Sequence, residues 1–416
     1  MIINAFDYNG VCSCGKNHVI NTKAAIIEPG CLGRIDKYLS AYGIEGKYCA
    51  LYGENSFRAT EGCHPMAEQV IIMESEGLHA NEISTAKVLS ALEDDIEVIL
   101  AVGSGTIHDI ARFCAHERGI RFVSCPTAAS VDGFCSTVAA MTWYGYKKTL
   151  PAVAPEIVIA DIDIIKNAPR ELTVSGIGDI MAKYTALADW RISHIVTGEY
   201  LCERIFSIMQ EARHTAVGCI RGIENGEDCA YEAVTYALIM SGLAMQMMGN
   251  SRPASGTEHH FSHTIEMGPE KLKVSFPAMH GEKAGVGTIY ALNEYKRLAA
   301  VEDITPYLRK YSPLDTDEIT DFFGETLGKA ILKENEDDCL AAVTPEDISN
   351  NWQAVRGVVA ELPNGAEVAS QLAALGGKST AASIGVAEED VPTILHYAPS
   401  VRNRLTLMRM KRMIQL

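Results

Sequence analysis

The chain has 416 residues, of which 47% are hydrophobic and 21% are charged, and its formal net charge is -17. This length exceeds what a single hydrophobic core usually supports, so we expect two domains. The acidic total and the scattered basic residues argue against nucleic acid and against an anionic membrane surface as partners. A small molecule is therefore the expected ligand.

The first residues, MIINAFDYNG, lack the basic start and apolar stretch of a signal peptide, and no run approaches the roughly 20 apolar residues of a membrane span. We therefore expect a cytosolic protein. Most of the twelve cysteines lie in apolar segments, which is typical of reduced core cysteines. The segment CSCGKNH has ligand-like spacing at Cys12, Cys14 and His18, with Cys63 and His64 further on. A metal knuckle and a plain turn with reduced thiols both explain this segment.

Short apolar runs alternate with helical stretches from about residue 24, a pattern that predicts a parallel sheet with crossover helices. Each run is nearly continuous in apolar residues and ends in Gly, Pro or a polar turn, as strands buried on both faces do. The expected strands are AAIIEPG (24–30), KYCALYG (47–53), QVIIME (69–74), EVILAVGSG (97–105) and RFVSCPT (121–127). We expect an α/β dinucleotide-binding domain with a Rossmann-like sheet over residues 1–169.

Strand patterns fade after VAPEIVIADIDIIKNAP (153–169), and long helical patterns follow, as in ALIMSGLAMQMM (237–248) and EITDFFGETLGKAILKE (318–334). We expect an all-helical second domain over residues 170–416, with the boundary near Pro169. A cleft between two such domains is the usual place for a ligand.

The stretch AVGSGTIHDIARF (101–113) runs from a strand through a glycine turn into a helix. Glycine lets the backbone approach a pyrophosphate, and the free N–H groups at the start of the helix bind the anion. A tight structural connection would look similar, because the spaced GxGxxG pattern is absent. The candidate phosphate-binding residues are Gly103, Ser104, Gly105, Thr106 and Ile107.

The next strand ends in the hydroxyl-rich loop PTAASVDGFCST (126–137), which contains Thr127, Ser130 and Ser136 around Asp132. In a parallel sheet this loop lies beside the glycine turn at the edge where ligands bind. The alternative is an Asx or Ser/Thr turn that leads into a β-hairpin at TVAAMTWYGYKKT.

Candidate metal ligands lie in three segments. GIGDIMAKYTALADWR (176–191) predicts a helix with Asp179 and Lys183 one turn apart on the same face. In SRPASGTEHHFSHTIEM (251–267), His259 and His263 are also four residues apart, and His280 follows 21 residues after His259. Two imidazoles and one carboxylate would form a three-ligand site with an open position, as a catalytic metal requires. Any one of these histidines alone would more often be a surface or core residue, and His260 points away from His259 on a helix.

Together, GSGTIHD, PTAAS with Asp132, GDIMAKYTALADW, SRPASGTEHHFSH and HGEKAGVGT resemble the superfamily of iron-type alcohol dehydrogenases, glycerol dehydrogenases and dehydroquinate synthases. The motifs occur in order over roughly residues 24–290. SGTEHHFSH and AKYTALADW look most like the sn-glycerol-1-phosphate dehydrogenases of the bacterial AraM type. The resemblance implies a dehydroquinate synthase-like fold, a homodimer, and a divalent metal, zinc or nickel, between the domains.

Carried over by motif, the resemblance implies metal binding by Asp179, His259 and His280. His263 would contact substrate or relay a proton, and Asp132 would contact a substrate hydroxyl. Gly103 to Ile107 would hold the pyrophosphate of NAD(H) or NADP(H), with Thr127, Ser130 and Ser136 along the nicotinamide half. Lys183 would orient Asp179 or meet the substrate, and Arg252 would bind the substrate phosphate; structural ion pairs are the alternative for both.

The implied reaction interconverts dihydroxyacetone phosphate and sn-glycerol 1-phosphate by hydride transfer, with the metal polarising the substrate oxygen. Glu54, after the strand KYCALYG, favours the free ribose hydroxyl of NADH, whereas Arg58 suits the 2′-phosphate of NADPH. The sequence leaves this choice open. The alternatives are a glycerol dehydrogenase acting on the unphosphorylated polyol and a dehydroquinate-synthase-like carbon–oxygen lyase.

Overall fold

A computed structural model describes residues 1–144 and 146–416. Contacts between Cα atoms divide the chain into two compact units that alternate along the sequence. The first unit comprises Met1–Ile180 and Glu211–Asn250, and the second comprises Met181–Gln210 and Ser251–Leu416. The domain boundary that we expect near Pro169 stays a prediction. Among the described residues, Pro169 lies after the last strand of the sheet, which ends at Asp161.

The first unit is built on a sheet whose described strands number seven, in the order β1-β4-β11-β8-β7-β5-β6. All neighbouring strands run parallel except β1, which pairs antiparallel with β4. The strands are β1 (Ile2–Asn4), β4 (Ala24–Glu28), β5 (Tyr48–Gly53), β6 (Gln69–Met73), β7 (Val98–Gly103), β8 (Arg121–Pro126) and β11 (Ile157–Asp161). Each strand expected between residues 24 and 127 is confirmed. Burial on both faces holds for the central strands, whose apolar runs are continuous. It is wrong for the edge strand β6, where Val70 and Ile72 are exposed.

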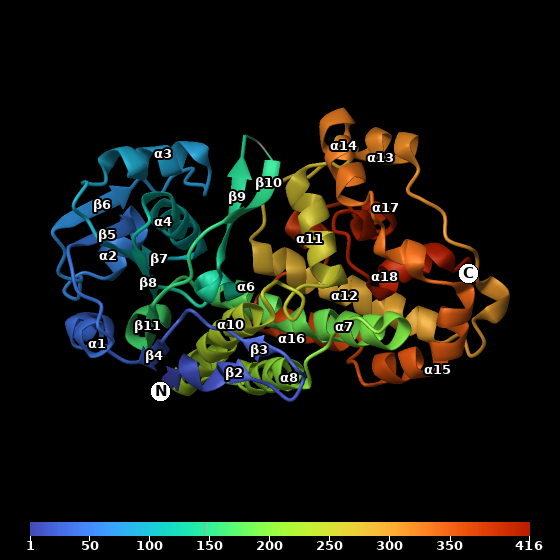
Figure 1. Cartoon of the computed structure of the whole chain (residues 1–416), viewed down its shortest axis with the longest axis horizontal. Coiled ribbons are helices and arrows are strands. Elements are labelled where there is room, and N and C mark those ends of the chain that lie inside the picture. The colour runs from blue at the N-terminus through green and yellow to red at the C-terminus, as the bar shows by residue number, and fades with distance from the viewer. Residues whose placement is uncertain (145) are drawn as a thin grey trace. The chain divides into compact units, whose positions relative to one another are not determined.

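Alternate residues of the central strands enter two separate cores. Ala50 and Tyr52 of β5 pack into one apolar cluster, whereas Cys49 and Leu51 pack into the other. The first cluster is completed by α1 (Ile35–Ala41), and the second by α3 (Glu82–Ala91) and α4 (Gly105–Arg118). Helices therefore cover both faces of the sheet (Figure 1).

The chain reverses direction across the sheet between β5 and β7. From β5 it passes through α2 (Glu54–Ala59) to the edge strand β6, and from β7 it passes through α4 toward β8. Connections that leave adjacent parallel strands in opposite directions open a crevice at the carboxyl ends of those strands. The Gly103–Ile107 turn and Glu54 both lie at this switch point.

The first unit contains further elements besides the sheet and the helices that cover it. They include a hairpin of β2 and β3, a second hairpin of β9 and β10, and the long apolar helix α10. Their bounds are β2 (Gly10–Val11), β3 (Asn17–His18), β9 (Val138–Trp143), β10 (Tyr146–Pro151), α5 (Ile162–Ile165), α6 (Arg170–Met181), α9 (Ile220–Glu224) and α10 (Asp228–Met248). Helix α8 (Glu203–Gly218) has residues in both units.

The described part of the second unit is helical and has its own apolar core, in which Phe261, Tyr295 and Trp352 are almost fully buried. The all-helical pattern expected for the C-terminal part is thus confirmed. The helices are α7 (Lys183–Thr197), α11 (Thr257–Met267), α12 (His280–Ala299), α13 (Thr316–Phe323), α14 (Glu325–Glu334), α15 (Pro345–Ala360), α16 (Gly365–Ala374), α17 (Val391–Tyr397) and α18 (Leu407–Met410).

Two segments that we expect to form single helices each contain two helices, so these predictions are wrong. The segment 318–334 contains two helices, because Gly324 adopts a φ of +83° that ends α13. The segment 176–191 is divided between α6 and α7 at Ala182. The carbonyl of Ala182 accepts the backbone N–H groups of both Thr185 (3.2 Å) and Ala186 (3.1 Å). The bond from Thr185 spans three residues rather than four, which is the tighter pattern of a 3-10 turn.

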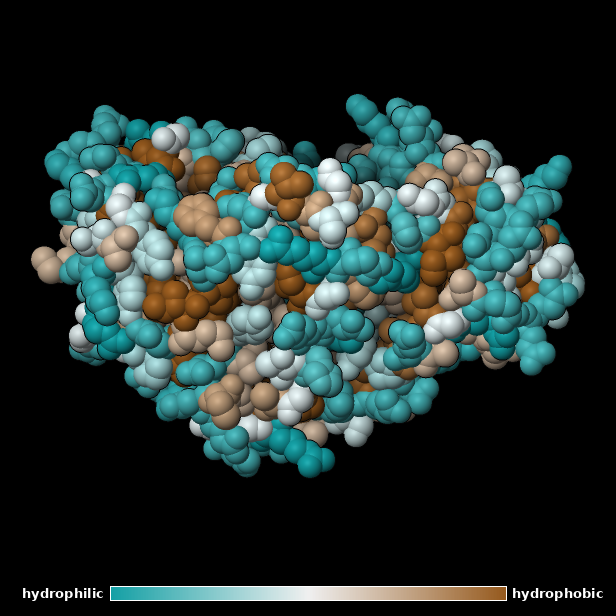
Figure 2. All heavy atoms as spheres, turned by 60° about the horizontal axis from the view of Figure 1, so that its bottom comes forward, coloured by the Kyte–Doolittle hydropathy of each residue, from teal (hydrophilic) through white to brown (hydrophobic). Residues whose placement is uncertain are grey.

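Hydrophilic side chains predominate on the face shown in Figure 2, with hydrophobic side chains in separate groups between them. Seven of the twelve cysteines are buried, as expected for core residues. Among the described residues, no helix combines the length and the apolar character that a membrane crossing requires.

Candidate active site

The glycine turn of the first unit joins β7 to α4. A Cβ atom on Gly103 would lie 2.7 Å from the Cβ of Ile107, so a larger residue does not fit there. Ser104 is the N-cap, and the helix begins at Gly105. The N–H groups of the first helical turn cannot bond within the helix and are available to an anion. The backbone N–H of Thr127 donates to the carbonyl of Gly103 at 3.0 Å, which joins the two predicted cofactor loops.

Two buried side chains that the sequence reasoning missed hold these loops. Arg112 donates to the carbonyls of Ser136 (2.8 Å) and Phe134 (3.2 Å). His108 bonds through Nδ1 to the carbonyl of Ser104 at 2.9 Å. Burial, assisted by the Arg112 charge, lowers the pKa of His108 to about 3, so this imidazole is neutral and its Nδ1–H donates. Both residues stand at helical spacing in GTIHDIARF, the only hint in the sequence.

The remaining cofactor candidates differ in exposure. Thr127 and Ser130 are buried, whereas the half-buried Ser136 donates its hydroxyl to the carbonyl of Val138 at 2.8 Å. Glu54 lies at the first position of α2, where one carboxylate oxygen accepts the N–H of Ser75 at 3.3 Å. The same oxygen lies 3.9 Å from the guanidinium of Arg58. Glu54, which favours NADH, and Arg58, which suits NADPH, are therefore neighbours.

Asp132 and Asp179 are held together in the first unit. The carboxylate of Asp179, fully buried, accepts the backbone N–H of Asp132 at 3.0 Å. The carboxylate of Asp132 accepts the hydroxyl of Ser241 on α10 at 2.7 Å, a partner that the sequence reasoning did not identify. Helix α6 approaches the loop so closely that a Cβ on Gly176 would lie 2.0 Å from the carbonyl oxygen of Ala129. Only glycine at this position allows α6 to hold Asp179 against the loop.

Three predicted histidines gather in the second unit. His259 and His263 lie one turn apart on α11, and His280 begins α12. The ring centroids are 5.2 Å apart for His259 and His280, and 5.9 Å apart for each of the other two pairs. Asp179, the third predicted metal ligand, belongs to the first unit.

A buried carboxylate orients His259. Glu258 accepts Nδ1–H of His259 at 2.7 Å, the N–H of Gly256 at 2.7 Å and the hydroxyl of Thr185 at 2.5 Å. Burial raises the pKa of Glu258, but these hydrogen bonds outweigh it and the pKa lies below its ordinary value. The carboxylate is therefore ionised and leaves Nε2 of His259 as the lone-pair nitrogen.

His280 has the same arrangement. Its Nδ1 lies 2.9 Å from Glu266, which also pairs with Lys283 at 3.0 Å. Burial raises the pKa of Glu266, yet the hydrogen bond from His280 and the nearby Lys283 charge hold it well below its ordinary range. A carboxylate on Nδ1 of a histidine is the usual outer contact of a metal ligand. Glu266 stands at i+7 from His259 and at i+3 from His263, but this spacing does not distinguish it from an ordinary helical carboxylate, and nothing in the spacing distinguishes Glu258.

His263 and His260 are both neutral, because desolvation lowers the pKa of each well below its ordinary value. His263 faces the other two rings, and its Nδ1 has no hydrogen-bond partner among the described protein atoms. The ligand atoms of His263, Glu266 and His280 also lie within 4.8 Å of one another. Neither ring nitrogen of His260 has a hydrogen-bond partner among the described protein atoms, and its expected role as a bystander stays a prediction.

The two cationic candidates are engaged with other groups in the second unit. Lys183, fully buried, donates to the carbonyl of Ala254 at 2.9 Å. Arg252 pairs with Glu199 at 2.8 Å and donates to the carbonyls of Asp189 and Leu405. For Arg252 these contacts support a structural ion pair rather than a phosphate ligand.

Asp189 is a further buried carboxylate that the sequence reasoning missed. It accepts the N–H groups of Thr257 (2.9 Å) and Leu407 (2.8 Å) and the hydroxyl of Tyr295 (2.6 Å). Burial raises its pKa to about 6, despite these hydrogen bonds. Asp189 thus fixes the start of α11, the helix that carries His259 and His263.

Comparisons with known proteins find similar sequences and a similar fold. A family model described as iron-containing alcohol dehydrogenase matches residues 26–169. A glycerol-1-phosphate dehydrogenase (NAD(P)+) of Bacillus velezensis is 35% identical, over 82% of this chain and 76% of its own length. One of Geobacillus stearothermophilus is 31% identical over 95% and 94% of the two chains. The fold is similar to the crystal structure of a probable glycerol dehydrogenase from Sinorhizobium meliloti 1021, with a TM-score of 0.62 at 18% identity over 94% and 91% of the two chains.

Proposed function

Because this chain belongs to the family of glycerol-1-phosphate dehydrogenases, we propose that it interconverts dihydroxyacetone phosphate and sn-glycerol 1-phosphate with NAD(H) or NADP(H). The observation that supports this reaction best is the pair of oriented histidines. His259 and His280 each have a carboxylate at Nδ1, so each presents Nε2 as a donor atom. This is the arrangement that a histidine needs in order to bind a metal.

We propose that Asp179, His259 and His280 bind one divalent cation, zinc or nickel. The donor set of two imidazoles and one carboxylate suits either metal and leaves a position for substrate. When bound, such a cation polarises the hydroxyl or carbonyl oxygen of the substrate and the nicotinamide exchanges the hydride. The steps that the chain's own residues perform are binding, orientation and proton movement.

In the first unit, Gly103, Ser104, Gly105, Thr106 and Ile107 are the proposed pyrophosphate site. Their support is the free first turn of α4 and its place at the switch point of the sheet. Thr127, Ser130 and Ser136 follow along the nicotinamide half. Glu54 is the proposed contact of the adenosine ribose, at the neighbouring strand end.

Asp132 is the proposed contact for a substrate hydroxyl. Its backbone is fixed by Asp179 and its carboxylate by Ser241, so the group is oriented before substrate binds. His263 is the proposed substrate contact or proton-relay group. Desolvation keeps its imidazole neutral, so one ring nitrogen is able to accept a hydrogen bond from the substrate hydroxyl. Lys183 is the proposed positioning residue at the start of α7, since its ammonium is buried against the carbonyl of Ala254.

The test is nicotinamide absorbance on mixing protein, a divalent cation and dihydroxyacetone phosphate with NADH or NADPH. We expect the reduced nicotinamide to be oxidised only when the ketone carries its phosphate group. This oxidation should stop when the cation is chelated and should be lost in His280→Ala. His396→Ala is the matched control, because His396 is an exposed histidine on α17 of the same unit. Oxidation by unphosphorylated dihydroxyacetone alone would instead indicate a glycerol dehydrogenase, and no oxidation with either ketone would favour the lyase.

A further inference from the structure

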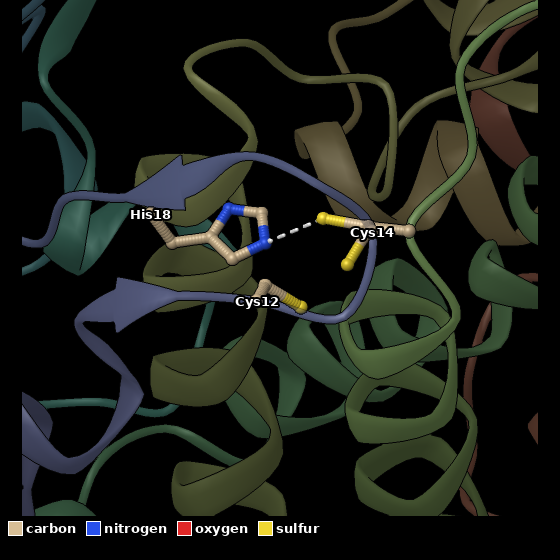
Figure 3. A group of neighbouring side chains, drawn as sticks. Cys12, Cys14 and His18 are labelled. Carbon is tan, nitrogen blue, oxygen red and sulfur yellow. Dashed lines mark hydrogen bonds between the residues drawn. The ribbon is translucent and has the colours of Figure 1, made fainter.

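The CSCGKNH segment folds into a small hairpin whose chemistry the dehydrogenase reaction does not use. Strands β2 and β3 pair antiparallel, with Gly10 opposite His18. The turn is closed by bonds from the N–H of Cys12 to the carbonyl of Lys16 (2.9 Å) and from the N–H of Gly15 to the carbonyl of Cys12 (3.0 Å). Gly15 adopts a φ of +85°, which permits this tight reversal. The hairpin brings Cys12, Cys14 and His18 to one side (Figure 3).

The donor atoms of these three residues converge. The two sulfur atoms and one ring nitrogen of His18 all lie within 4.8 Å of one another, and Sγ of Cys14 lies 3.4 Å from Nε2 of His18. Tetrahedral zinc, with bonds of about 2.3 Å to sulfur and about 2.0 Å to nitrogen, holds its ligand atoms about 3.5–3.8 Å apart. The separation between Sγ of Cys14 and Nε2 of His18 is therefore close to that of a zinc site, and Sγ of Cys12 lies within 4.8 Å of both atoms.

The outer contact of His18 fixes its tautomer. Nδ1 lies 2.8 Å from the carbonyl oxygen of Met247, in the last turn of α10. A carbonyl only accepts, so Nδ1 carries the hydrogen and the lone pair of Nε2 faces Cys14 (Figure 3). The ring is 2% exposed, so water does not compete for this nitrogen. Histidines that bind metals show this same pattern.

Cys63 and His64, which the spacing of the sequence also offered, do not join the group among the described residues. The thiol of Cys63 donates to the carbonyl of Thr60 at 3.2 Å, and His64 bonds to the carbonyl of Phe57 at 2.8 Å. Two thiols and an imidazole without a carboxylate select zinc over magnesium or calcium. These three ligands leave the fourth position of a tetrahedron to a ligand from outside the hairpin.

We propose that Cys12, Cys14 and His18 bind a structural zinc ion, distinct from the proposed catalytic cation. Binding releases the two thiol protons to solvent and forms two zinc–sulfur bonds and one zinc–nitrogen bond. The ion would fix the N-terminal hairpin, and the hydrogen bond from Nδ1 of His18 to the carbonyl of Met247 joins that hairpin to the end of α10. Gln246 strengthens this connection, since it accepts the N–H of Asn21 at 2.8 Å and donates to the carbonyl of Cys135 at 2.6 Å.

Cobalt substitution separates this site from the catalytic one. Cobalt(II) bound by thiolates gives an intense charge-transfer absorption in the near ultraviolet, and a site of nitrogen and oxygen ligands does not. We expect this absorption in the wild-type chain, a loss of most of it in Cys14→Ser, and its retention in His280→Ala. The zinc content of the Cys14→Ser chain should fall by about one ion, because a mononuclear zinc site of this kind holds a single ion. Cys229→Ser is the matched control, because Cys229 is an exposed cysteine of the same unit.

Alkylation of the wild-type chain provides a test that does not depend on the folding of a variant. We expect Cys12 and Cys14 to resist alkylation in the zinc-loaded protein and to react after chelation, while Cys229 reacts in both states. Absence of the thiolate absorption in the wild-type chain would overturn the proposal. Equal labelling of Cys12 and Cys14 with and without zinc would overturn it as well. Neither result would bear on the dehydrogenase activity, which is measured separately.

Discussion

Gly176→Ala tests whether the close approach of α6 to the cofactor loop builds the site. The new Cβ would lie 2.0 Å from the carbonyl oxygen of Ala129 and 3.1 Å from Leu238, whereas real Cβ atoms essentially never approach within 3.0 Å. The helix or the loop must therefore move by about 1 Å, a displacement that costs about 100-fold in rate when it reaches the reacting groups. Overpacking of this kind also destabilises by about 1–3 kcal/mol.

The assay compares kcat/KM for dihydroxyacetone phosphate and the urea midpoint of unfolding in Gly176→Ala and in Gly357→Ala. Gly357 lies in α15, and no heavy atom lies within 4 Å of a Cβ placed there. Alanine at that position should leave activity unchanged and stabilise the chain by about 0.5–1 kcal/mol. If Gly176→Ala retained the activity and stability of the wild-type chain, the contact between α6 and the loop would not be what positions Asp179.

Three further changes test other parts of the site. Glu266→Gln should weaken cation binding about 10–100-fold in competition with a chelating dye, because His280 loses its charged outer contact; unchanged affinity would contradict that role. Ser241→Ala should lower kcat/KM about 10-fold or more, because Asp132 loses a hydrogen bond to a charged group; a wild-type value would remove Ser241 from the site. The pKa of His108 is lowered from 6.5 to about 3, so its contribution to stability is present above pH 6.5 and is lost as the pH falls. Between pH 7 and pH 5, denaturant unfolding should show a loss of about 2 kcal/mol in the wild-type chain that His108→Phe lacks; identical pH profiles would refute it.

The sheet was predictable from sequence because its strands are short apolar runs that end in glycine, proline or polar turns. The expected runs at 24–30, 47–53, 69–74, 97–105 and 121–127 each contain a strand. The interruptions at Ala182 and Gly324 were not predictable from apolar periodicity, which continues through both positions. The first coincides with a backbone bond that spans three residues, from Thr185 to Ala182, and the second with the left-handed backbone of Gly324.

The histidines of the site were predictable because they are few and clustered, but the groups that orient them were not. Glu258 and Glu266 look like ordinary helical carboxylates, and only the structure shows that each accepts a hydrogen bond from a ring nitrogen. Ser241 stands 109 residues after Asp132, so no local pattern connects the two. Periodicity and residue spacing do not predict contacts between segments that are distant in the sequence.

The stereochemistry of the product tests the central claim most directly. The protein is incubated with dihydroxyacetone phosphate, the preferred reduced nicotinamide and a divalent cation, and the glycerol phosphate formed is offered to a dehydrogenase specific for the sn-3 enantiomer. We predict a stoichiometric product that this second enzyme does not oxidise, because the product is sn-glycerol 1-phosphate. Complete oxidation by the second enzyme, or the absence of any glycerol phosphate, would contradict the proposed function.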